Sequence, residues 1–145
     1  SENIRQYEDI ILELLINSYE SNFQLENGEY KEICEEKIQL LKEYIDNDTA
    51  IVIGAFREGE LVGFLWIYIH QYFGEKRMHV NHISVRRQFR GKGIGKSLMN
   101  ELERQAKNQG IENIDLFVSE KNKDAMKMYT EMGFVTERRY MKRKL

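Results

Sequence analysis

Proline is absent from this chain of 145 residues, and no internal repeat or low-complexity tract divides it. A linker between two domains is therefore not expected. The length is enough for one domain that buries a substantial core. We predict a single domain over residues 1–145.

Cysteine is nearly absent, since Cys34 is the only one. An intramolecular disulfide and a cysteine-rich zinc site are thereby excluded, and we expect no metal site. The longest apolar run, residues 61–69, is far shorter than the roughly 20 residues of a membrane span. No secretory signal pattern opens the sequence, so we expect a cytoplasmic protein without a membrane partner.

The net charge of −2 hides an uneven distribution. Residues 1–50 hold 13 acids and 4 bases (net −9), whereas residues 51–145 hold 11 acids and 18 bases (net +7). We attribute most of the acids to solvated helix faces. The alternative is a basic half that binds an anionic cofactor and an acidic half near a cationic acceptor.

Hydrophobic periodicity predicts an α/β fold. The expected helices are residues 7–19, 30–45, 94–109 and 122–132, with a loop over 21–29. The expected strands are residues 2–5, 50–56, 61–72, 78–85 and 113–118, with a closing strand or hairpin over 134–144. Three strands form an antiparallel meander, and a right-handed βαβ unit follows, so the sheet is mixed and lies between helices.

A glycine-rich segment follows the strand that ends at Ile83-Ser84-Val85. It reads Arg90-Gly91-Lys92-Gly93-Ile94-Gly95-Lys96-Ser97 and opens an amphipathic helix. Uncovered backbone N–H groups and the positive end of a helix dipole favour an anionic ligand, usually a phosphate. Basic residues at positions 86, 87, 90, 92 and 96 strengthen this interpretation.

Two familiar phosphate loops do not fit this segment. A P-loop requires glycine where Arg90 stands, and a dinucleotide fingerprint requires glycine where Lys96 stands. The pattern that remains is R-x-x-G-x-G, from Arg90 to Gly95.

This pattern resembles the pyrophosphate loop of the GNAT superfamily of N-acetyltransferases, which bind acetyl-coenzyme A. A second match lies downstream, in Asn122-x-x-Ala125-x-x-x-Tyr129-x-x-x-Gly133-Phe134, and the ending Tyr140 to Leu145 is typical of small bacterial members. Members often have a proline where this chain has Arg86-Arg87, which adds positive charge near the expected nucleotide.

The resemblance implies a sheet splayed at its centre, with helices on both faces, that admits the pantetheine arm. Backbone groups of Ile83 and Val85, on either side of Ser84, would pair with pantetheine. The N–H groups of residues 91–96 would hold the pyrophosphate, assisted by Lys96 and Ser97. Ser97 has an alternative role as a helix cap. Asn122 is expected to cap its helix, to contact pantetheine, or to do both.

The resemblance also implies the catalytic groups. Tyr129 matches the proton donor to the departing thiolate, and the amide of Ile83 is the expected oxyanion donor. Alternation along the 78–85 strand places His79 on the face of Ile83 and Val85, with His82 on the other face. His79 is therefore a candidate base, with a plain strand-end residue as the alternative.

The acceptor is expected near residues 21–30 and 136–142, and a small-molecule amine is favoured over a protein amine. A homodimer is expected as well. One rival is a non-catalytic acyl-coenzyme A sensor or partner-binding module on the same fold. Nucleic-acid binding through Arg86, Arg87, Arg90 and Lys92 is not expected, because the cluster is short and the chain is acidic.

Overall fold

The computed structural model describes residues 2–22 and 29–145. The helices are α1 (Glu2–Arg5), α2 (Glu8–Asn22), α3 (Glu29–Asp46), α4 (Ile94–Asn108) and α5 (Lys123–Glu131), with a short 3-10 turn η1 (Arg87–Phe89). The strands are β1 (Ala50–Arg57), β2 (Glu60–Tyr72), β3 (Glu75–Val85) and β4 (Asn113–Leu116). Among the helices of the described ranges, none combines the length and the apolar character that crossing a membrane requires.

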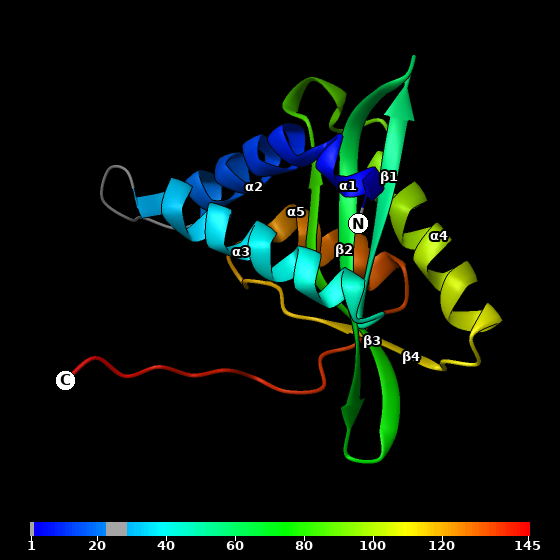
Figure 1. The fold of residues 1–145 in the computed structure, drawn as a ribbon. Helices are drawn as coiled ribbons and strands as arrows, with labels where there is room; N and C mark the ends of the chain where they lie inside the picture. The colour runs from blue at the N-terminus through cyan, green and yellow to red at the C-terminus, as the bar shows by residue number, and fades with distance from the viewer. Residues whose placement is uncertain (1, 23–28) are drawn as a thin grey trace.

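The four strands form one mixed sheet in the order β1-β2-β3-β4 (Figure 1). β1, β2 and β3 are antiparallel neighbours joined by tight turns, whereas β4 runs parallel to β3. The connection from β3 to β4 contains α4, which gives the expected βαβ unit. The predicted mixed sheet is confirmed.

Helices cover both faces of this sheet (Figure 1). α4 buries Ile94, Leu98, Leu102 and Ala106, which recur every four residues and therefore line one side of the helix. They pack with Tyr129 of α5 in one apolar cluster. On the other face, α2 and α3 pack a second cluster against the sheet, whose buried members include Leu14, Ile38, Leu41, Phe64 and Trp66.

β3 and β4 separate along their length. They pair only from Arg77 to Val80 on β3, opposite Asn113 to Leu116 on β4. The remainder of β3, through Val85, keeps β2 as its neighbour but has no β4 residue on its other side. The sheet is thus splayed at the point where the glycine-rich loop begins.

A β-bulge at Asn81 changes which side chains share a face. His82 lies opposite Trp66 and Val80 opposite Ile67, so Asn81 has no partner on β2. One extra residue reverses the alternation, so Val80, rather than His79, packs with Ile83 against the α4 side. The expectation that His79 shares the face of Ile83 and Val85 is therefore wrong.

Three expected elements differ from the structure. Residues 2–5 form the helical turn α1 instead of a strand, because this turn lets Ile4 pack against the second cluster. β4 ends at Leu116, two residues earlier than expected. Residues 134–144 form no strand, and the tail runs away from the sheet (red in Figure 1) with Val135 and Tyr140 exposed. An alternating pattern makes a strand only where it pairs with a sheet edge, and this tail pairs with neither edge strand, β1 or β4.

Candidate functional site

The glycine-rich loop turns through left-handed backbone at two positions. Gly91 has φ 74° and Gly93 has φ 77°, values that L side chains rarely adopt. A Cβ atom added at either position would meet no atom within 4 Å. The loop therefore leaves open space over its backbone, where a ligand can approach closely.

The N-terminus of α4 is uncapped. Gly93 is the N-cap residue and has no side chain to bond the first-turn amides, and the first turn contains no acid. The first helical bond runs from the Ser97 amide to the Gly93 carbonyl, at 3.0 Å. The amides of Ile94, Gly95 and Lys96 precede that bond and are free to bind an anion.

The side chains of this turn divide into two groups. Ile94 is 6% exposed in the core, so only its amide can face a ligand, whereas Lys96 and Ser97 are exposed. Ser97 lies inside the first turn and Gly93 holds the cap position, so the cap alternative for Ser97 is wrong. The exposed hydroxyl and ammonium groups are free to contact an anion.

The basic residues around the loop do not all face it. Arg86 lies 3.6 Å from Glu60 and 3.9 Å from Glu13, with only 18% of its side chain exposed. The Arg90 Nε atom donates a 2.9 Å hydrogen bond to the Val85 carbonyl. Lys92 lies over the Phe89 ring at 5.4 Å. The positive charge that Arg86 was expected to add near the nucleotide is therefore paired with acids elsewhere.

The end of β3 offers backbone groups more than side chains. Ile83, Ser84 and Val85 lie beyond the last residue paired with β4. The Ser84 side chain is buried and its hydroxyl donates to the Leu14 carbonyl of α2, at 3.4 Å. Only the main chain of Ser84 is available to a ligand.

Tyr129 and Asn122 belong to α5. The Tyr129 ring is 7% exposed and meets the Phe134 ring edge-on at 5.5 Å. Burial raises the pKa of the Tyr129 hydroxyl, which keeps it protonated at neutral pH. Asn122 caps α5, because its Oδ1 accepts from the Ala125 amide at 3.2 Å. The predicted cap role of Asn122 is confirmed.

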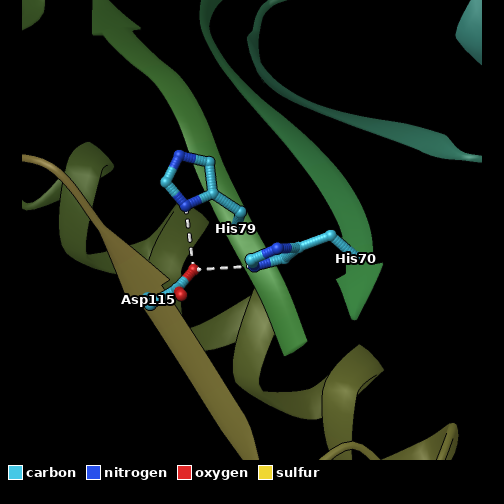
Figure 2. Close-up of side chains that lie close together, drawn as sticks. All are labelled: His70, His79 and Asp115. Carbon is cyan, nitrogen blue, oxygen red and sulfur yellow. Dashed lines mark hydrogen bonds and ion pairs between the residues drawn. The ribbon is translucent and has the colours of Figure 1, made fainter. Parts of the chain in front are cut away.

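His79 lies in a cluster with His70 and Asp115, two residues that the sequence did not point to as functional (Figure 2). Its Nδ1 lies 2.8 Å from Oδ1 of Asp115 on β4, and Nε2 of His70 on β2 lies 3.4 Å from the same oxygen. The parallel register sets His79 directly beside Asp115. The antiparallel register of β2 and β3 adds His70, and no motif in the sequence specifies either register.

His82 lies on the α2–α3 side of the sheet, opposite Ile83 and Val85 as expected, but on the same face as His79, which was not expected. Its ring stacks between Tyr19 of α2 and Phe64 of β2. Burial, with a smaller contribution from the Lys37 ammonium, lowers the pKa of His82 to about 4. The imidazole is therefore neutral at physiological pH.

Most of the expected acceptor segment, residues 23–28 of 21–30, lies outside the described residues. Its last positions, Glu29 and Tyr30, begin α3. The second expected segment, residues 136–142, belongs to the exposed tail, which Glu137 ties to Arg77 of β3 at 2.9 Å.

The sequence and the fold both match known acetyltransferases. The model of the Acetyltransferase (GNAT) family matches residues 11–134. This chain belongs to the GNAT family. The sheet that splays beyond Val80, with helices on both faces, is the architecture of that family.

Curated GNAT relatives match part of their own length. Mycothiol acetyltransferase of Streptomyces coelicolor is 37% identical over 90 residues, covering 61% of this chain and 28% of that protein. The uncharacterized N-acetyltransferase YdgE of Bacillus subtilis is 28% identical over 88 residues, covering 61% of this chain and 56% of its own. The chain thus spans less than two thirds of the length of either relative.

Solved GNAT structures match nearly the whole chain. A putative acetyl transferase from Pyrococcus furiosus has a TM-score of 0.81 and 29% identity, over 97% of this chain and 95% of that one. An aminoglycoside acetyltransferase from an uncultured soil metagenome has a TM-score of 0.74 over 100% of this chain and 91% of that one. At 17% identity, the second shares the fold alone.

Proposed function

We propose that residues 1–145 form one acetyltransferase domain that moves the acetyl group of acetyl-coenzyme A to the amine of a small molecule. The observation that supports this most strongly is the uncapped start of α4, which directly follows the unpaired end of β3. One feature suits a pyrophosphate and the other suits an extended amide chain.

In this proposal the backbone amides of residues 91–96 bind the pyrophosphate, with Lys92, Lys96 and Ser97 beside them. The exposed backbone of Gly91 and Gly93 suits this role, because no side chain covers it. Pantetheine then lies along Ile83–Val85 and reaches Asn122. The Val85 carbonyl accepts a hydrogen bond from Arg90 and keeps a second lone pair with which it can accept from pantetheine.

The chemical step is direct attack in a ternary complex. The neutral amine nitrogen attacks the thioester carbonyl carbon, and the amide of Ile83 donates to the oxyanion that forms. The carbon–sulfur bond then breaks. Tyr129 gives its proton to the departing thiolate, and its raised pKa keeps that proton available. The tyrosinate regains a proton from solvent.

His79 is the candidate acceptor of the proton that the amine loses. Asp115 engages Nδ1 of His79, which leaves Nε2 as the nitrogen that can take a proton directly or through water. Asp115 acts here as a positioning residue. The bulge at Asn81 puts His79 and Ile83 on opposite faces, so this transfer requires the amine to lie within the opening between β3 and β4.

A small-molecule acceptor is supported by a relative that is named for mycothiol. The rival function is a non-catalytic acyl-coenzyme A sensor or partner-binding module, which would use the same loop. Measuring turnover distinguishes the enzyme from the sensor, whereas both are expected to bind the cofactor.

An amine panel tests the proposal, with release of free thiol from acetyl-coenzyme A as the readout and calorimetry for coenzyme A binding. Cys34 is 0% exposed, so the protein's own thiol adds little to the signal. Thiol release with at least one amine supports the enzyme. Binding without release across the panel favours the sensor, and absence of binding overturns both.

A further inference from the structure

His70, His79 and Asp115 place three metal-ligating atoms together on three neighbouring strands. One atom from each side chain lies within 4.8 Å of the other two. Figure 2 shows both rings directed at the same carboxylate oxygen, Asp115 Oδ1, from β2 and β3. None of the three residues belongs to the glycine-rich loop or to α5, so the cluster is separate from those parts of the proposed cofactor site.

The three positions are fixed by the sheet. His79 pairs with Tyr68 on one side and with Asp115 on the other, while His70 pairs with Arg77, two residues along β3 from His79. All three side chains therefore project from one face of a hydrogen-bonded ladder. They are 16–35% exposed, which leaves the cluster open to an ion from solvent. A site on strands holds its ligands with little reorganisation.

The surroundings of the carboxylate favour a cation. Arg77 approaches the other oxygen, Asp115 Oδ2, at 3.5 Å, and so leaves Oδ1 facing the histidines. Arg77 itself is paired with Glu75 at 2.7 Å and Glu137 at 2.9 Å. Arg138 also acts on Glu137, so the three carboxylates and two guanidinium groups here sum to −1. Outer partners of this kind orient a ligating carboxylate.

The donor set selects the class of ion. Two imidazole nitrogens and one carboxylate oxygen suit a divalent transition metal, whereas Mg²⁺ and Ca²⁺ prefer oxygen ligands alone. Three protein ligands leave a fourth tetrahedral position for water. We propose that His70, His79 and Asp115 bind one Zn²⁺ ion.

This site goes beyond the proposed acetyl transfer and does not depend on it. The two uses of His79 exclude each other, since Zn²⁺ on Nδ1 leaves the ring proton on Nε2. His79 then has no nitrogen free to accept a proton from an amine. The zinc-loaded chain is therefore a form in which His79 cannot act as the base.

Titration calorimetry with ZnCl₂ tests the site on untagged protein that has been freed of metal by dialysis. We expect one ion per chain with a dissociation constant below about 100 μM, and at least a roughly 10-fold weaker one in each of His70→Gln, His79→Gln and Asp115→Asn. His82→Gln is the matched control. It removes the third histidine of the chain, which lies outside the cluster, and should leave the zinc affinity unchanged.

Substitution by Co²⁺ gives a second readout, because its visible absorption is intense in tetrahedral sites and weak in octahedral ones. Far-ultraviolet circular dichroism of each variant separates loss of ligand from loss of fold, and Asp115→Asn, which keeps the shape of the side chain, is the variant least prone to misfolding. Absence of zinc binding overturns the site. Equal affinity in all variants, or affinity retained in His70→Gln, also overturns it.

Discussion

Arg90 and Val85 are joined by a 2.9 Å hydrogen bond from the guanidinium Nε to the carbonyl oxygen. The bond closes the turn η1 and returns the start of the glycine-rich loop to the end of β3. Two parts of the proposed cofactor site, the strand end and the loop, are thereby held at a defined separation before any ligand binds. Such preorganisation reduces the conformational entropy that is lost when the ligand binds.

The loop assignment predicts that Gly93→Val abolishes binding of coenzyme A. Valine at φ 77° is strained, and its side chain projects into the open space over the first amides of α4. Isothermal calorimetry with coenzyme A measures the effect. Gly59→Val is the matched control, since Gly59 has φ 83° in the β1–β2 turn and an equally open Cβ position. Affinity retained in Gly93→Val would refute the assignment of the loop.

The proposed acid predicts that Tyr129→Phe lowers kcat by roughly 10- to 1,000-fold with little change in cofactor affinity. The substitution removes the hydroxyl and keeps the ring, so the edge contact with Phe134 and the core packing persist. Steady-state kinetics with the best amine of the panel give the ratio. Tyr44→Phe serves as the control, because Tyr44 lies in the cluster on the other face of the sheet, outside both expected acceptor segments, and its ring keeps the edge contact with Tyr68. Unchanged turnover removes Tyr129 from the mechanism.

The loop and α5 could be predicted from the sequence because their signals are local. Gly91 and Gly93 precede an apolar repeat, and Asn122 lies three residues before the amide that it caps. Such patterns depend on a few neighbouring residues, which the sequence displays directly.

The cluster of His70, His79 and Asp115 could not be predicted in this way. It depends on the register of three strands, and the bulge at Asn81 reverses the face on which His79 lies. A single inserted residue has this effect without leaving a pattern in the sequence. The prediction of a closing strand was wrong for a related reason: the alternation of residues 134–144 is visible in the sequence, but whether they pair with an edge strand is not.

Cys34 provides a test of the packing between α3 and the sheet. Its side chain is 0% exposed, and burial raises the pKa of the thiol, so little reactive thiolate is available. We expect a thiol reagent to modify native protein at least about 100-fold more slowly than protein in denaturant, because reaction requires opening of the fold. The double variant Cys34→Ala/Asn100→Cys, with its thiol on an exposed position of α4, should react at the denatured rate. Rapid modification of native Cys34 would contradict the packing.

His82 makes the stability of the fold depend on pH. In the native state its pKa is lowered to about 4, mainly by burial between Tyr19 and Phe64, whereas the unfolded histidine titrates near its usual value of about 6.5. Between these two values the unfolded chain binds a proton that the folded chain does not. Stability therefore falls as the pH drops through this window, by about 2 kcal/mol from pH 7 to pH 5. Urea unfolding of wild type and His82→Gln at both pH values measures this loss. Carboxylates titrate alike in both proteins and cancel in the comparison, so the wild type should lose about 2 kcal/mol more than the variant. Equal losses would mean that His82 is protonated as readily in the fold as in water.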